Sequence, residues 1–314
     1  MKLSTQIPIA KADHQIDYES GLLLLGSCFS ENIGAKFEYF KLKSLSNPFG
    51  ILFHPLAIQK VLERSVHQHK FTESDIFFWN ERWHCFEVHS DLSALSKEEL
   101  LERLNQALET TLEHLKKSTH LMITLGTAWV YRNKKSGETV ANCHKVPQSN
   151  FGKELLGIDE IRASLEAMVA TMRSINPKVT LMFTVSPVRH LKDGFIANQR
   201  SKAHLISAIH EVVKKKQVSY FPSYEIMMDE LRDYRFYSPD LVHPNETAIN
   251  YIWEKFKDTQ ISEAAFKTMG EVEIIQKGLM HKAFNPTSEA NRIFQKSLQE
   301  KIAYIKRSYP FMEF

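Results

Sequence analysis

Residues 22–30 read Leu22-Leu23-Leu24-Leu25-Gly26-Ser27-Cys28-Phe29-Ser30. The four leucines form an apolar run without polar alternation, which is typical of a strand buried on both faces of a parallel sheet. A helical pattern follows at once, and it predicts a helix over 29–40. Ser27 and Cys28 would then lie at the carboxyl end of a strand and at a helix N-terminus, where unpaired backbone N–H groups favour negative charge. A thiolate, an alkoxide or an oxyanion would be stabilised there.

A second informative stretch lies far downstream, at Ser238-Pro239-Asp240-Leu241-Val242-His243-Pro244-Asn245. It precedes a helix predicted from Glu246 to about Phe256, so its polar side chains lie on a loop, where catalytic groups are common. An aspartate three residues before a histidine can hydrogen-bond the imidazole and fix its tautomer. Asp240 and His243 are therefore candidate catalytic residues, with His243 as a general base.

Together the two stretches resemble the SGNH (GDSL-like) hydrolase superfamily, which combines a glycine-led nucleophile segment with Asp-x-x-His-Pro. Within it, Gly26-Ser27-Cys28-Phe29-Ser30 resembles the signature of the GSCFA-domain family, with Ser30 where the family name has alanine. The resemblance covers roughly residues 15–258. It implies a three-layer α/β/α fold with a central parallel sheet and an activity on acyl esters.

Three interpretations of the nucleophile remain open. Counted from Gly26, the superfamily pattern places the nucleophile at its third position, which is Cys28. Ser27 would then act as a helix-capping hydroxyl, but it could itself be the nucleophile. In the third interpretation neither residue reacts covalently. A cysteine at a helix N-terminus near a histidine can have a lowered pKa, so we expect that Cys28 could be a thiolate at neutral pH.

The remaining chain alternates strands and helices, which predicts a parallel sheet with helices on both faces. Buried strands are predicted over 120–125, 179–185 and 218–221, a β-hairpin over about 75–89 centred on Asn80 and Glu81, and a long helix from Ser96 to about Lys117. From about residue 259 only helices follow. We therefore predict an α/β domain over 1–258 and a helical extension over 259–314.

Several residues after predicted strands are candidates for binding substrate or an oxyanion. The resemblance implies an oxyanion glycine near the first strand, and Gly26 and Gly50 are the candidates. Where many relatives carry an oxyanion asparagine, this chain has Ala128, so a neighbouring polar group would have to replace it. The candidates for oxyanion or substrate binding in the later loops are Gly126, Thr127, Asn142, His144 and Arg189.

Composition limits the other function classes. The chain has 314 residues, 43% of them apolar, and a net charge of only +3, which gives no basis for a nucleic-acid or membrane-surface interaction. Its 3 cysteines form no metal-ligand pattern or disulfide framework, and no stretch is long and apolar enough for a membrane span. We expect no metal, no cofactor and, by default, a cytoplasmic location.

The sequence therefore favours an esterase-like hydrolase of a small-molecule or carbohydrate ester, for example an O-acetyl carbohydrate. Two alternatives remain: an acyltransferase to a glycan or other hydroxyl, and a non-catalytic binding protein on the same fold. The oligomeric state is left open.

Overall fold

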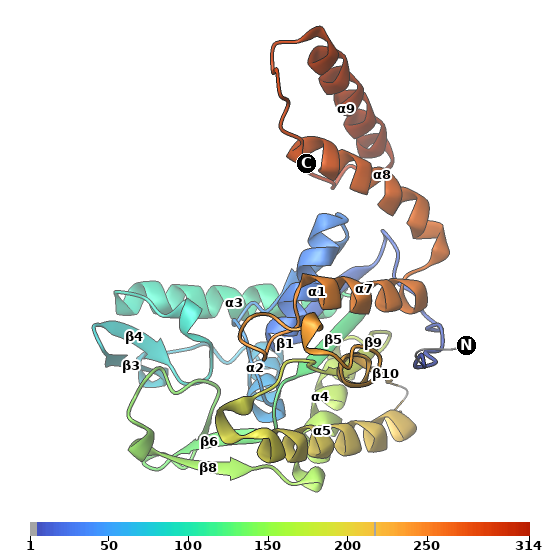
Figure 1. Ribbon diagram of the computed structural model, residues 1–314. Helices are drawn as coiled ribbons and strands as arrows, with labels where there is room; N and C mark the ends of the chain where they lie inside the picture. The colour runs from blue at the N-terminus through green and yellow to red at the C-terminus, as the bar shows by residue number, and fades with distance from the viewer. Residues whose placement is uncertain (1–4, 217) are drawn as a thin grey trace.

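The computed structural model describes residues 5–216 and 218–314, and a five-stranded parallel sheet lies at its centre (Figure 1). The strand order is β10-β9-β5-β1-β2. The bounds are β1 (Gly21–Gly26), β2 (Lys43–Ser46), β5 (His120–Leu125), β9 (Thr180–Val185) and β10 (Ser219–Phe221). Because all five strands are parallel, their carboxyl ends meet at one edge, where ligands bind in sheets of this kind.

The leucine run of β1 separates two hydrophobic cores. Leu23 and Leu25 face a core completed by α2 (Pro55–Val66), α3 (Lys97–Lys117), α4 (Ile158–Ile175) and α5 (Phe195–Lys216). Leu22 and Leu24 face the opposite core, which contains α1 (Cys28–Tyr39) and α7 (Glu246–Gln260). Alternate strand residues point to opposite faces, so an uninterrupted apolar run is what a sheet covered on both sides requires. The predicted three-layer α/β/α fold is confirmed.

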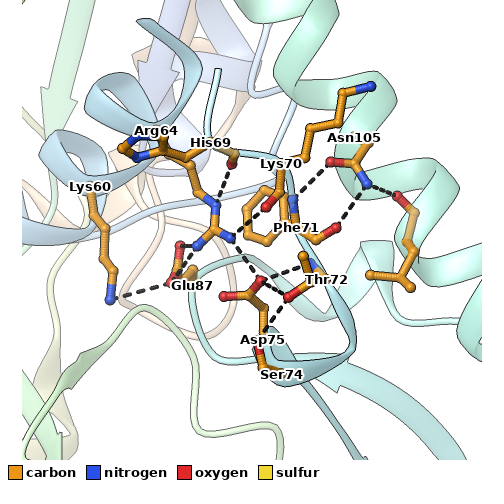
Figure 2. A network of polar contacts seen from close by, with 11 residues as sticks. Lys60, Arg64, His69, Lys70, Phe71, Thr72, Ser74, Asp75, Glu87 and Asn105 are labelled. Atoms are coloured by element: carbon orange, nitrogen blue, oxygen red, sulfur yellow. Dashed lines mark hydrogen bonds and ion pairs between the residues drawn. The ribbon is translucent and has the colours of Figure 1, made fainter. Parts of the chain in front are cut away.

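The hairpin is also confirmed, as β3 (Ile76–Trp79) and β4 (Arg82–Cys85). Its turn residues Asn80 and Glu81 have φ values of 47° and 62°, which is the backbone that a two-residue hairpin turn requires. Arg64 anchors the neighbouring segment (Figure 2): its guanidinium contacts the carboxylates of Asp75 at 2.8 Å and Glu87 at 3.1 Å, and it stacks on Phe71. This network ties α2 to the base of the hairpin.

The edge strand β2 was not predicted from the sequence. A second, antiparallel sheet has the order β7-β6-β8, with β6 (Trp129–Asn133), β7 (Thr139–Val140) and β8 (Phe151–Leu155). The sequence predicts a strand over 139–141, where β7 lies, but not β6 or β8. After β10 the sequence predicts a helix over 224–233, and the structure has a short helix, α6 (Ser223–Glu225), followed by one π-helical turn, Ile226–Glu230. Short 3-10 turns occupy Glu73–Asp75, Ser90–Leu92, Gln148–Asn150, Leu191–Asp193 and Tyr234–Phe236.

Two helices follow the sheet, α8 (Glu263–Met280) and α9 (Glu289–Ser308), and Figure 1 shows them extending away from the α/β body. Both helices nevertheless contact the body. Their buried residues Val272, Ile275 and Leu298 share the hydrophobic core of α1 and α7, and Gln276 Nε2 donates to the Tyr39 carbonyl at 2.9 Å. The division of the chain into domains at residue 258 stays a prediction. Among the helices of the described residues, none combines the length and the apolar character that crossing a membrane requires.

Candidate active site

Gly26 makes the turn from β1 into α1. Its φ is 132°, and a Cβ at this position would lie 2.1 Å from the carbonyl oxygen of Thr124 on β5. The Gly26 amide donates to Asn47 Oδ1 at 2.8 Å, and its carbonyl accepts from Leu52 N at 2.9 Å. The glycine therefore lets the chain leave the sheet while it still touches the neighbouring strand.

Ser27 and Cys28 have different environments. Ser27 is only 1% exposed and is the N-cap of α1, with its hydroxyl accepting from Phe29 N at 3.3 Å. Cys28 is the first residue of the helix and is partly exposed. The accessible nucleophilic atom at this turn is therefore the sulfur of Cys28, while the hydroxyl of Ser27 satisfies the helix N-terminus.

The pKa of the Cys28 thiol is raised, contrary to the sequence-based expectation. Burial is the larger cause, and the carboxylate of Glu31 one turn along α1 adds to it. The charge of Lys202 and the backbone N–H groups of Cys28 and Phe29 act in the opposite direction. At neutral pH the resting residue is thus a thiol, and attack by its sulfur would require a proton acceptor.

Asp240 and His243 form the contact that their spacing predicted. Asp240 Oδ2 lies 2.6 Å from His243 Nδ1, while Oδ1 accepts from the amides of Val242 and His243 at 2.9 and 3.0 Å. These hydrogen bonds lower the pKa of Asp240 to about 2. The carboxylate is therefore ionised at neutral pH and fixes the Nδ1 face of the imidazole, which leaves Nε2 free for proton transfer.

The loop that carries this pair is tied to the active edge of the sheet. Arg189, just after β9, donates its amide to the Val242 carbonyl at 3.2 Å. A hollow of about 490 Å³ separates the loop from α1; Asn32 and Lys36 line one side, and Ser238 and Pro244 line the other. Asn32 lies one helical turn after Cys28, so the helix that begins at Cys28 and the histidine loop border the same hollow. Among the described residues, the only hydrogen-bond partner of the His243 ring is Asp240.

The amides of the other oxyanion candidates are engaged within the protein, as the amide of Gly26 is. The Gly50 amide donates to the Asn47 carbonyl at 2.7 Å, and the amides of Gly126 and Thr127 both donate to the Phe53 carbonyl, at 2.8 and 3.0 Å. Ala128 is fully buried, and its amide donates to Ser201 Oγ at 2.7 Å. These amides already have acceptors, so they hold the loop over the sheet edge.

Asn142 and His144 have structural environments. His144 is 3% exposed, and its ring contacts Ser90 Oγ and the Cys85 carbonyl at 3.0 and 2.7 Å. Burial lowers its pKa to about 4, so the ring is neutral. Asn142 Oδ1 accepts from the His144 amide at 2.8 Å and stabilises a turn in which His144 has a φ of 48°. His144 thus joins the hairpin to the loop after β7, and Asn142 supports the turn that positions it.

The guanidinium of Arg189 lies over the ring of Tyr237, 4.1 Å from its centroid. Two buried residues that the sequence did not single out also lie at this edge of the sheet, His190 and Lys202. His190 approaches Gly126, with its Nε2 3.4 Å from the place of a Cβ on that glycine. Lys202 of α5 is 1% exposed and interacts electrostatically with Cys28. Lys202 does carry a sequence signal, since it shares the apolar face of its helix with Leu205 and Ile209.

A comparison with known protein families identifies the family of this chain. Its sequence matches the GSCFA family over residues 21–256. The chain belongs to the GSCFA family. Residues 272–314 of this GSCFA chain also match the GSCFA domain protein, C-terminal domain.

Other comparisons are less informative. No curated protein sequence matches the GSCFA chain. Among solved structures it is similar to an acetyl xylan esterase (Est2A) from the rumen bacterium Butyrivibrio proteoclasticus, with 9% sequence identity and a TM-score of 0.35. That similarity covers 81% of this chain and 66% of the length of the esterase.

Within residues 5–216 and 218–314, no three or more His, Cys, Asp or Glu side chains gather in a group that could hold a metal ion.

The close backbone contact at Gly26 leads to a prediction about the stability of the protein. Gly26→Ala should lower the free energy of unfolding by about 3 kcal/mol, because the methyl group meets the Thr124 backbone in a conformation that alanine avoids. Gly270→Ala on α8, where no described atom lies within 4 Å of the added carbon, should instead stabilise by about 0.5–1 kcal/mol. Urea unfolding of the two variants measures both changes, and equal stabilities would contradict this account of the turn.

Proposed function

We propose that this GSCFA protein is an esterase-like hydrolase of SGNH type, with Cys28 as nucleophile, His243 as general base and Asp240 as the residue that orients the base. The observation that carries the proposal is the 2.6 Å contact between Asp240 and His243, on a loop that borders the same hollow as the helix of Cys28. An exposed carboxylate–imidazole pair and a cysteine at a helix N-terminus would together supply a nucleophile, a base and a group that orients the base.

In the proposed reaction, His243 Nε2 takes the proton from the Cys28 thiol as the sulfur attacks the ester carbonyl carbon. The N–H group of Cys28 and the dipole of α1 stabilise the oxyanion that forms. The intermediate collapses when the C–O bond to the alcohol breaks, and the imidazolium returns the proton to the leaving oxygen. Water, activated by the same histidine, then cleaves the thioester and releases the acid.

Cys28 is preferred to Ser27 because of exposure and hydrogen bonding. The hydroxyl of Ser27 is buried and accepts the Phe29 amide, so attack from it would uncap the helix. The sulfur of Cys28 is partly exposed and has no such structural role.

The substrate class follows from the surroundings and from the family resemblance. Asn32, Lys36, Asn245 and Asn250 contribute polar side chains to the hollow, which suits an alcohol component rich in hydroxyl groups. An O-acetyl carbohydrate fits this description. Transfer of the acyl group to a glycan hydroxyl in place of water would use the same residues. The proposal also places the protein in the cytoplasm.

A non-catalytic binding protein is the second candidate. It is favoured by one observation: the amides of Gly50, Gly126 and Thr127 are all engaged within the protein, so the oxyanion would depend on the α1 N-terminus. Turnover of an ester separates this candidate from the enzyme.

Hydrolysis of p-nitrophenyl acetate provides the first test. We expect turnover by the wild type, a fall of roughly 10²–10⁴-fold in His243→Ala, and loss of turnover in Cys28→Ala. Ser27→Ala should stay active, with a stability loss of about 1 kcal/mol from the missing cap. An active Cys28→Ala with an inactive, folded Ser27→Ala would assign the nucleophile to Ser27 instead. Absence of turnover in the wild type would favour the binding protein or a transferase that needs its acceptor.

The orienting role of Asp240 predicts a pH dependence. Its folded pKa of about 2 lies below its ordinary value, so its ionised interaction with His243 is present above the ordinary value and is lost only as pH falls toward about 2. Asp240→Asn should therefore reduce kcat by roughly 10²-fold or more, by a similar factor throughout the neutral and alkaline range.

Asp233→Asn is the matched control for this substitution. Asp233 is another exposed aspartate with a lowered pKa, and it caps the turn Tyr234–Phe236 just before the histidine loop. The substitution Asp233→Asn should leave kcat unchanged. An equal loss of activity in both variants would mean that Asp240 acts only on the conformation of the loop.

A further inference from the structure

Lys202 is a buried cation at the active edge of the sheet. Its Nζ donates to the carbonyls of Gly126 at 2.8 Å and Ser186 at 2.7 Å, which directly follow β5 and β9. The side chain is 1% exposed, and among the described residues no carboxylate forms an ion pair with it. An ammonium group held inside a protein without an opposite charge is costly, and such groups occur preferentially at functional sites.

The titratable groups around Lys202 come from three elements. Cys28 interacts with it from α1, and the carboxylate of Glu31 acts on the same thiol. His190, from the segment after β9, is held neutral because burial and the charges of Lys202 and His243 lower its pKa to about 3. The ring of Tyr224 on α6 has its centroid 5.3 Å from Nζ, and burial raises the pKa of its hydroxyl to about 12.

Cys28 is therefore the neighbour of Lys202 that can become an anion during the reaction. His190 can only become a cation, and Tyr224 ionises only in strongly alkaline solution. The position of Nζ is fixed by two strand-end carbonyls, so its charge does not need to be moved into place when the anion forms.

We propose that Lys202 is a positioning residue whose buried ammonium group stabilises the thiolate of Cys28. The inference rests on the proposed role of Cys28 as nucleophile, but it concerns the acidity of the thiol and can be tested without any substrate.

The proposal has a specific pH signature. Burial lowers the pKa of Lys202 to about 7, while a thiolate at Cys28 raises it. Below about pH 7 Lys202 is charged and its stabilisation of the thiolate is fully present. Above that value the resting lysine loses its proton, and the stabilisation is progressively lost. A residue that only supports the fold would change thiol reactivity by the same factor at every pH.

The test is the rate of alkylation of Cys28 by iodoacetamide as a function of pH, followed by peptide mass spectrometry, which distinguishes Cys28 from Cys85 and Cys143. Below about pH 7, in Lys202→Met the reaction should be about tenfold slower than in the wild type, which corresponds to a rise of one unit in the thiol pKa. The ratio should fall toward one as the pH rises. Lys214→Met, an exposed lysine on the same helix, removes the same charge and should leave the profile unchanged.

A ratio that does not vary with pH, or no difference between Lys202→Met and the wild type, would overturn the proposal. Where Lys202→Met does not fold, the wild-type profile decides: it should flatten above about pH 7 as Lys202 titrates, and a uniform rise up to the thiol pKa would overturn the proposal. The flattening should persist in His243→Gln, because it belongs to the lysine. This test does not measure ester hydrolysis. A wild type without esterase activity would therefore overturn the proposed function, but the pH dependence of Cys28 alkylation could still be interpreted.

Discussion

The close contact between the backbone of Gly26 and the Thr124 carbonyl is the constraint on which the site depends. Since no side chain fits there, β1 can end against its neighbour and turn directly into α1. The turn fixes where α1 begins, buries Ser27 as the helix cap, and exposes Cys28 at the position with the most positive backbone potential. This one turn brings together the proposed nucleophile, the positive end of the helix dipole and the edge of the sheet.

Burial determines the electrostatics at the carboxyl edge of the sheet, where Cys28 and Lys202 lie. The thiol of Cys28 is made less acidic by desolvation and by Glu31, so neither the helix N-terminus nor Lys202 makes the resting residue a thiolate. Such a thiol is protected from adventitious reaction, and in the proposed mechanism it reacts when His243 accepts its proton. The carboxylate of Asp240, with a pKa of about 2, keeps its full negative charge next to the imidazole of His243 and would stabilise the imidazolium that forms. In the proposed mechanism, proton transfer would take place on the exposed side of the site and charge stabilisation on its buried side.

The sequence predicts those features that depend on local patterns. The apolar runs of β1, β5 and β9, the Asn80-Glu81 turn and the Asp240–His243 spacing each specify their structure within a few residues. The edge strand β2 was not predicted because Lys43-Ser44-Leu45-Ser46 contains a single apolar side chain. Its pairing comes from β1 rather than from its own composition.

The remaining errors concern tertiary contacts. His144 carries a polar side chain on a loop after a strand, which favours a binding role, yet the hairpin folds over it and makes it a buried hydrogen-bonding group. The amides of Gly126 and Thr127 are occupied by the Phe53 carbonyl, from a loop that is distant in sequence. Lys202 lies on an apolar helix face, but its partners are the strand-end carbonyls of Gly126 and Ser186, and no local pattern specifies them.

The central claim is that the sulfur of Cys28 attacks the ester. It is tested most directly by rapid acid quenching during turnover of an activated acetyl ester, followed by peptide mass spectrometry. The account predicts one acetyl group per chain, attached to Cys28 and released by hydroxylamine as a thioester. An acetyl group on Ser27, or continuing turnover without any covalent adduct at this turn, would contradict it.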